Sequence, residues 1–169
     1  MRFFLTGFMG CGKSFWGQRI AAKHHLHFID LDEYIEEHEN ETIANLFATK
    51  GEPYFREQEH QYLNKAINEN RHFIMACGGG TPCFHSNMNL MNEHGVTIYL
   101  NATADHLYKN LQQDESARPL LKKIDGTISI DFIKTMLLQR EKFYTQSTHI
   151  VDAASMNETI FARIIETYV

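Results

Sequence analysis

Apolar and polar positions along the chain separate into short apolar runs and longer amphipathic stretches, which alternate. The apolar runs cover residues 2–6, 27–32, 71–76, 96–100 and 149–151. Runs of this length between turn signals are typical of strands that are buried on both faces. Strands that alternate with helices form a parallel sheet with helices on both sides. We therefore expect an α/β protein, a three-layer α/β/α domain built on a five-stranded parallel sheet.

The stretches between the strands are compatible with helices. Expected helices cover about residues 14–25, 33–40, 42–48, 54–70, 87–93, 103–112, 130–144 and 157–168. Thr42 can cap the third of these, and Gly51 with Pro53 should interrupt the chain before the fourth. Residues 113–126 are polar and charged instead, which predicts a mobile excursion from the domain.

The first strand runs directly into a glycine-rich loop. Residues 7–14, GFMGCGKS, satisfy G-x-x-x-x-G-K-[ST] between a strand and a helix. Glycine lets the backbone N–H groups surround a polyphosphate, and the helix start adds a positive dipole end. This predicts a P-loop in which Lys13 reaches the β- and γ-phosphates and the Ser14 hydroxyl binds Mg²⁺. An incidental glycine-rich turn is the weaker alternative. The expected nucleotide-binding residues are Gly10, Cys11, Gly12, Lys13, Ser14 and Phe15.

Two other strands also end in residues suited to a site. The second ends in Asp-Leu-Asp, and in an extended backbone Asp30 and Asp32 point to the same side. The third runs into Gly78–Gly80, which allows a ligand to approach the backbone closely, although a simple turn would also explain it. Because the carboxyl ends of parallel strands meet at one edge, we expect these segments to converge with the P-loop.

Composition narrows the class of protein. A length of 169 residues suits one domain, and a net charge of −5 argues against a general nucleic-acid or anionic-membrane surface. Three cysteines, an odd number, make a disulfide framework improbable, and no apolar stretch is long enough to span a membrane. The histidines match no zinc-site spacing. We expect a single cytoplasmic domain over residues 1–169, without nucleic-acid or membrane partners.

Two arginines within the expected helices, Arg56 and Arg140, could hold an anion, because a guanidinium matches a carboxylate or phosphate. Either one alone could equally be a surface residue. Taken with the other motifs, however, the order along the chain resembles the shikimate kinase family of nucleoside monophosphate kinase-like P-loop enzymes. The matching segments are GFMGCGKS (7–14), DLD (30–32), FREQE (55–59), GGG (78–80), RPLL (118–121), REKFY (140–144) and a strand ending in Val151-Asp152.

The resemblance implies ATP-dependent phosphorylation of the 3-hydroxyl of shikimate, with ATP as co-substrate and Mg²⁺ as cofactor, in chorismate and aromatic amino acid biosynthesis. By matching position, Lys13, Asp32 and Arg118 would be catalytic, and Arg118 would also bind ATP from a lid of about residues 112–126. A helical segment of about 33–62 would bind substrate, and Ser14 and Asp30 would serve the metal. Shikimate would contact Asp32, Phe47, Phe55, Arg56, Gly78, Gly79, Gly80 and Arg140. A monomer is expected.

Two positions depart from the family pattern. Leu111 stands where an arginine commonly stacks on adenine, with Lys109 nearby, and residues 152–157 lack the arginine and proline often found beside the base. We therefore do not expect a guanidinium to stack on adenine, and Lys109 could replace only its charge, with an effect on nucleotide affinity or base selectivity. Two alternatives are another small-molecule kinase of the same group, such as a gluconate kinase, and a nucleotide-dependent binding module without transfer. Arg56, the triple glycine and Arg140 together favour a carboxylated ring as acceptor, and a binding module needs no acceptor clamp.

Overall fold

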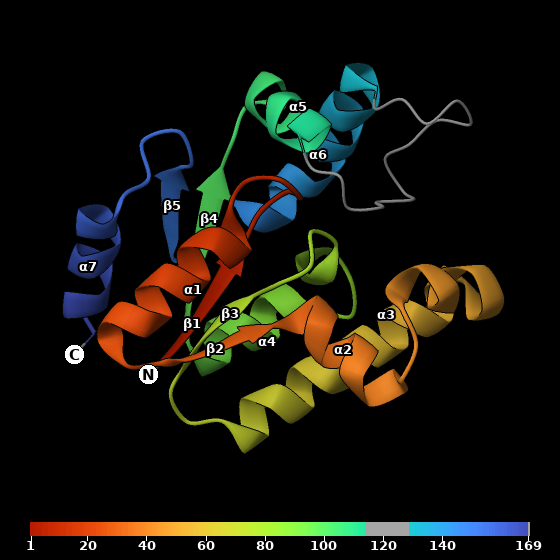
Figure 1. Ribbon diagram of the computed structural model, residues 1–169, viewed down its shortest axis with the longest axis horizontal. Helices are drawn as coiled ribbons and strands as arrows, with labels where there is room; N and C mark the ends of the chain where they lie inside the picture. The colour runs from red at the N-terminus through yellow and green to blue at the C-terminus, as the bar shows by residue number, and fades with distance from the viewer. Residues whose placement is uncertain (114–128, 169) are drawn as a thin grey trace.

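The computed structural model describes residues 1–113 and 129–168 and confirms the expected α/β architecture (Figure 1). Five parallel strands form one sheet in the order β2-β3-β1-β4-β5. Their bounds are β1 (Arg2–Thr6), β2 (His27–Asp30), β3 (Phe73–Ala76), β4 (Val96–Asn101) and β5 (His149–Asp152). The expected lid, with Arg118, lies outside the described residues except for positions 112 and 113, which end a helix.

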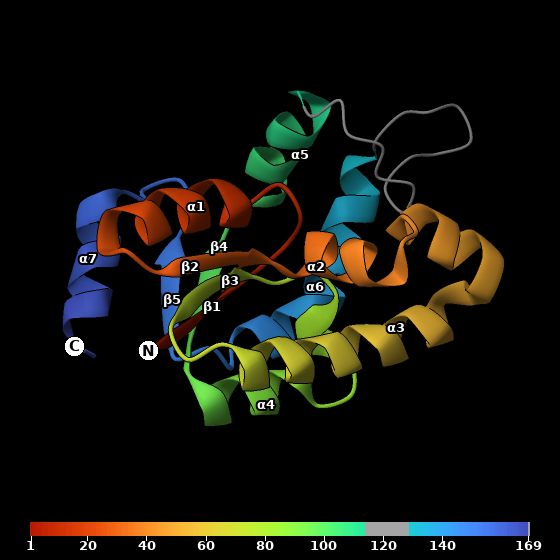
Figure 2. The same ribbon diagram turned by 60° about the horizontal axis from the view of Figure 1, so that its bottom comes forward.

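The helices agree closely with the amphipathic stretches of the sequence. They are α1 (Lys13–His24), α2 (Leu31–Glu39), α3 (Ile43–Glu69), α4 (Asn87–His94), α5 (Ala104–Gln113), α6 (Ile130–Tyr144) and α7 (Glu158–Glu166), with a 3₁₀ turn η1 (Thr81–Cys83). Helices α1 and α7 lie on one face of the sheet, and α4 with the second part of α3 lies on the other (Figure 2). This confirms the three layers. No helix in the described ranges is both long and apolar enough to cross a membrane.

Alternation along the central strand divides the core in two. Phe3 and Leu5 belong to one hydrophobic cluster, whereas Phe4 belongs to the cluster on the opposite face, where its ring meets Phe73 edge to face at 5.4 Å. Successive side chains of a strand point to opposite faces, so a strand covered by helices on both sides must be apolar throughout. This is why the apolar runs without alternation predicted the strands.

The register of the sheet brings the strand ends to a common level. Leu5 of β1 is paired with Ala76 of β3, and Ala76 is paired in turn with Asp30 of β2. The P-loop, the triple glycine and the aspartate pair therefore leave the sheet side by side. Parallel pairing alone produces this convergence, because every strand presents its carboxyl end at the same edge.

The expected interruption at Gly51 is confirmed. Gly51 has φ 82° and ψ 168° within α3, so the helical segment before it and the one after it meet at a kink. Glycine accepts this backbone conformation because it has no side chain to clash. Thr42 caps the first segment, accepting a hydrogen bond from the Asn45 amide at 3.3 Å. The kink allows Phe47 and Phe55 to pack with ring centroids 4.7 Å apart.

The expectation that Asp30 and Asp32 lie in one extended strand is wrong. The strand ends at Asp30, and α2 begins at Leu31. The Asp30 carboxylate caps the helix by accepting a hydrogen bond from the Asp32 amide at 3.1 Å. An aspartate satisfies an otherwise unpaired amide at a helix start, and the helix dipole favours the acids that follow. The two carboxylates still face one cavity, but through a helix cap rather than strand alternation.

Candidate active site

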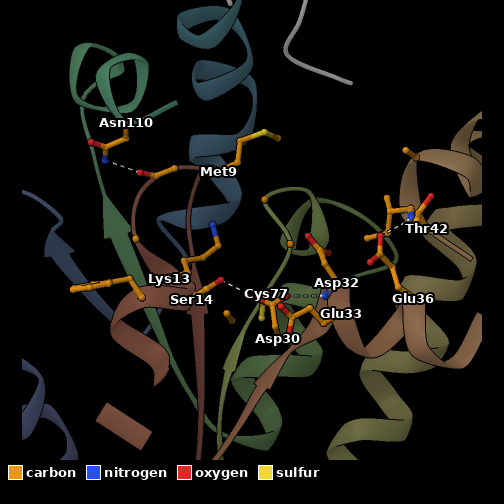
Figure 3. A pocket seen from close by; sticks show the side chains of 18 of the residues that line it. Met9, Lys13, Ser14, Asp30, Asp32, Glu33, Glu36, Thr42, Cys77 and Asn110 are labelled. Atoms are coloured by element: carbon orange, nitrogen blue, oxygen red, sulfur yellow. Dashed lines mark hydrogen bonds between the residues drawn. The ribbon is translucent and has the colours of Figure 1, made fainter. Parts of the chain in front are cut away.

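Two adjoining cavities lie at the carboxyl edge of the sheet. The larger, of about 910 Å³, is lined by the P-loop, by the start of α2 and by the first part of α3 (Figure 3). The smaller, of about 80 Å³, lies among Arg56, Glu59, Arg140 and the triple glycine. The structure therefore brings together the segments that the motifs predicted would converge. The cavities share Met9, Asp32, Ile43, Phe47, Gly78 and Gly79.

Two features determine the conformation of the P-loop: glycines in the left-handed region, and contacts from Asn110 and Leu111 of α5. Gly10 has φ 83° and Gly12 has φ 96°, a region that other residues adopt only with strain. Asn110 donates a hydrogen bond from Nδ2 to the Gly10 carbonyl at 2.8 Å. A Cβ atom on Gly10 would come within 3.0 Å of the Leu111 side chain. Leu111 therefore packs beneath the loop and is buried in the core.

Lys13 lies at the floor of the loop. Its Nζ donates hydrogen bonds to the carbonyls of Gly7 and Phe8, both at 2.9 Å, and its side chain is almost fully buried. These two backbone contacts hold the ammonium group within the turn. The Cys11 side chain belongs to the hydrophobic core, so only its backbone can reach a ligand. Phe15 projects outward and is 57% exposed.

Ser14 and Asp30 place two oxygen atoms that could serve as metal ligands beside Lys13. The Ser14 hydroxyl donates a hydrogen bond to Asp30 Oδ2 (Figure 3), and the two oxygens are 2.6 Å apart. No group of three or more His, Cys, Asp or Glu side chains suited to a metal ion occurs within residues 1–113 and 129–168. A hydroxyl and one carboxylate fit Mg²⁺, which keeps several waters and takes few protein ligands.

Asp32 occupies an unfavourable place for a charge. Burial, followed by the nearby carboxylates of Asp30 and Glu59, raises its pKa to about 7, while Lys13 and Arg56 act in the opposite direction. A Cβ atom on Gly78 would lie 2.8 Å from Asp32 Oδ1, so glycine is needed for the loop to approach this carboxylate. A carboxyl group that titrates near neutrality in a cavity is a candidate for exchanging a proton with a ligand.

Arg56 is fixed by a buried network on α3. Its Nη1 lies 2.9 Å from Glu59 Oε2, and its guanidinium lies 4.3 Å from the centroid of the Phe84 ring. Glu59 is 1% exposed and also accepts a hydrogen bond from the Thr81 hydroxyl at 2.6 Å. Glu59 stands within the FREQE motif, but no role was predicted for it. Its spacing of three from Arg56 on a helix was the signal that could have identified the pair.

Arg140 approaches the same cavity from α6. Its guanidinium lies 5.7 Å from the Phe8 ring centroid, and a Cβ atom on Gly79 would lie 3.4 Å from its Nη1. This Nη1 is buried, and no residue in the described ranges accepts a hydrogen bond from it. A buried donor without a partner is costly, so the position suits a ligand that brings an acceptor.

The remaining predicted residues fall at different places. Phe47 lines both cavities and Phe55 only the smaller, so both lie at the expected wall. Arg118 lies outside the described residues. Lys109 is exposed on α5. Asn157 caps α7, its Oδ1 accepting from the Ile160 amide at 3.0 Å.

Comparisons with known proteins agree with this geometry. A family model described as "Shikimate kinase" matches residues 9–169. A shikimate kinase from Bacteroides thetaiotaomicron is 40% identical over 94% of this chain and 90% of its own. A crystal structure of shikimate kinase from that organism is 39% identical, with a TM-score of 0.89 over 99% of this chain and 97% of that one. A shikimate kinase structure from Aquifex aeolicus, 27% identical, has a TM-score of 0.79 over 99% and 95%. The chain therefore belongs to the shikimate kinase family.

Proposed function

We propose that this chain uses ATP to phosphorylate the 3-hydroxyl of shikimate, giving shikimate 3-phosphate and ADP for chorismate and aromatic amino acid biosynthesis. Family membership over nearly the whole chain supports the reaction. The observation that carries the assignment of residues is the pair of adjoining cavities, which share Asp32, Gly78 and Gly79. We call residues 7–15 with Asp30 the nucleotide half of the site. The acceptor half comprises Asp32, Arg56, Gly78–Gly80 and Arg140.

In the nucleotide half, the loop amides and the start of α1 bind the phosphates of ATP. Lys13 already lies within the loop, so its positive charge is in place before the nucleotide arrives. Charge on the transferring phosphoryl group spreads over its equatorial oxygens, and a fixed cation stabilises this distribution without having to reorganise.

Ser14 and Asp30 are the residues that would hold Mg²⁺. Their oxygens are already 2.6 Å apart, and both line the larger cavity. When bound, Mg²⁺ offsets negative charge on the β- and γ-phosphates. The Ser14 hydroxyl would exchange its hydrogen bond with Asp30 for a bond to the cation. Asp30 would keep its second oxygen on the Asp32 amide, so the helix cap could persist through binding.

In the acceptor half, Arg56 and Arg140 hold the shikimate carboxylate. The Arg140 Nη1 is buried without an acceptor among the described residues, and a carboxylate would supply one. Glu59 orients Arg56 through an ion pair and partly neutralises the positive charge of its guanidinium. The three glycines let the ring approach the backbone, and Phe47 with Phe55 forms an apolar wall.

Asp32 then faces the 3-hydroxyl. Its pKa of about 7 lets it accept a hydrogen bond from that hydroxyl and take the proton as the phosphoryl group transfers. A loose transition state demands little basicity of this group, so its orientation matters more than its strength. Arg118 is proposed, from its place in the RPLL motif, to close over ATP and approach the transferring phosphoryl. A cytoplasmic monomer likewise remains a proposal from the sequence.

A coupled assay of ADP release tests the function. Purified protein is supplied with ATP, Mg²⁺ and either shikimate, gluconate or no acceptor. We expect ADP release that depends on shikimate and stays at background with gluconate. Turnover with gluconate alone would assign the chain to another acceptor, and no turnover with either would favour a nucleotide-binding module.

A further inference from the structure

A buried tyrosine outside the roles assigned above is bonded to the triple glycine. The hydroxyl of Tyr144, the last residue of α6, donates to the Gly79 carbonyl at 2.5 Å, across 65 residues of sequence. Tyr144 follows Arg140 by one helical turn and is completely buried. A hydroxyl in such a place is retained at a cost unless it is hydrogen-bonded, and its single donor is directed at this one peptide.

Gly79 differs from its neighbours in how its carbonyl is held. The Gly78 carbonyl accepts from the Thr81 amide at 3.1 Å, and the Gly80 carbonyl accepts from the Cys83 amide at 2.9 Å. Both are local turns that the chain forms with itself. The Gly79 carbonyl depends instead on a side chain from a distant helix. Glycine has the widest conformational freedom of all residues, so the peptide after Gly79 needs this contact to hold one orientation. We call the hydrogen bond from Tyr144 to the Gly79 carbonyl the tether.

The tether also sets the direction of an amide at the acceptor cavity. No peptide in the described residues is cis, so the carbonyl of Gly79 and the N–H of Gly80, which share one peptide plane, point in opposite directions. Within residues 1–113 and 129–168, no group accepts a hydrogen bond from that N–H. Gly80 lines the smaller cavity with Arg56 and Arg140. Holding the carbonyl on Tyr144 therefore leaves the Gly80 N–H directed away from it and available.

Tyr144 is itself anchored to the sheet. Its ring packs on that of Tyr99 in the central part of β4, with centroids 5.1 Å apart and planes at 36°. Burial raises the pKa of Tyr144, which keeps the hydroxyl protonated as a donor. The same side chain belongs to the helix that carries Arg140, so one element sets both the arginine and the glycine peptide.

We propose that Tyr144 is a positioning residue for the acceptor, which fixes the Gly79–Gly80 peptide so that its N–H and Arg140 are presented together to an anionic group of the substrate. This rests on the proposed function for the identity of the substrate. The orientation of the peptide, however, is a property of the protein alone. The two statements can therefore be tested separately.

Tyr144→Phe removes only the hydroxyl. We expect the KM for shikimate to rise roughly two- to twelvefold, the equivalent of one hydrogen bond, while the KM for ATP stays within about twofold. Tyr99→Phe is the matched control, because it removes a hydroxyl that donates to Asn101 at 3.1 Å from the ring stacked on Tyr144. It should leave both KM values unchanged while lowering the melting temperature by a comparable amount.

Backbone mobility separates the two proposals. The ¹⁵N order parameters of the Gly79 and Gly80 amides, measured by NMR relaxation on ligand-free protein, should be lower in Tyr144→Phe than in wild type and unchanged in Tyr99→Phe. Failure of wild-type protein to phosphorylate shikimate would overturn the proposed function, and the order parameters would then decide the role of Tyr144. Unchanged order parameters in Tyr144→Phe, an unchanged shikimate KM, or an equal rise of that KM in Tyr99→Phe would each overturn the positioning role.

Discussion

The nucleotide half of the site comes almost entirely from one uninterrupted stretch, residues 7–15, whereas the acceptor half gathers side chains from α2, α3, the triple glycine and α6. In the nucleotide half, backbone groups form most of the expected contacts with phosphate. The Lys13 ammonium group is itself hydrogen-bonded to main-chain carbonyls. In the acceptor half, side chains from separate elements must arrive at one small cavity. A local motif suffices for a phosphate cradle, but recognition of an acceptor depends on how the whole domain packs.

The two halves also handle charge differently. Lys13 has its ammonium group bonded within its own loop, so nothing distant is required to hold it. Arg56 instead needs Glu59, which in turn needs Thr81, and Arg140 has a buried nitrogen without an acceptor in the described ranges. In the ligand-free protein, the acceptor half therefore holds a buried hydrogen-bond donor that a ligand could satisfy. Variants in one half alone test whether nucleotide binding and acceptor binding can be changed independently.

Lys13→Ala should have the largest effect. It removes the cation beside the transferring phosphoryl group, so turnover should fall below detection in the ADP-release assay while circular dichroism shows an intact fold. Lys23→Ala is the control, since Lys23 lies on the same helix and its side chain is 50% exposed in a surface ion pair with Glu158. Turnover of Lys13→Ala at the wild-type rate would contradict the role of Lys13 in the nucleotide half.

Asp32→Asn should lower kcat by about 10²- to 10⁴-fold, because the amide cannot accept the proton of the hydroxyl. For wild type, kcat/KM should fall as the pH drops below about 7, where Asp32 becomes protonated. Glu37→Gln, an exposed change on the same helix, should leave the profile intact. A wild-type profile that is flat from pH 5 to 8 would contradict the role of Asp32.

Relative to wild type, the same variant should become more stable as the pH rises, because wild type loses a stabilising contribution that the variant lacks. The Asp32 pKa of about 7 lies above its ordinary value of 3.8, so the native state holds this proton more tightly than the unfolded state. That contribution is present below the unfolded pKa and is lost as the pH rises through 7. Urea unfolding should therefore show the free energy of unfolding of Asp32→Asn, relative to wild type, increasing between pH 4 and 8 by on the order of 2 to 4 kcal/mol.

Arg140→Ala should weaken shikimate binding by about 2 to 5 kcal/mol, since it removes one partner of a desolvated ion pair. The KM for ATP should change much less, because the acceptor half is distinct from the P-loop. Lys142→Ala removes an exposed cation from the same helix and serves as the control. An unchanged shikimate KM in Arg140→Ala would refute the carboxylate clamp.

Particular residues show how far the sequence predicts such a structure. The strands and the P-loop could be predicted because their signals are contiguous and depend on backbone geometry. The interruption at Gly51 could be predicted for the same reason, since Gly51 and Pro53 lie two residues apart and both residue types disfavour a helix interior. Asp32 was misplaced because Asp30 both ends β2 and caps α2, and a short window of sequence does not show that the chain turns into a helix directly after Asp30.

Contacts between distant elements were the part that could not be predicted. Asn110 and Gly10 are 100 residues apart, and Glu59 and Thr81 are 22 apart, so no local pattern indicates either hydrogen bond. Leu111 could be recognised as a departure from the family pattern, but only the fold shows that it packs beneath Gly10. The family resemblance supplied the roles of Arg56 and Arg140, whereas the network that orients Arg56 required the structure.

Asn110→Ala should give the smallest effect, and it is the most sensitive test of whether the nucleotide half and the acceptor half are independent. It removes the hydrogen bond from α5 to the Gly10 carbonyl, so the KM for ATP should rise about three- to tenfold while the KM for shikimate stays constant. Asp105→Asn, an exposed change on the same helix, should alter neither value. Because Gly79 lies against the backbone of Met9, the two halves do touch, and a parallel rise of both KM values would show that they respond as one unit rather than two.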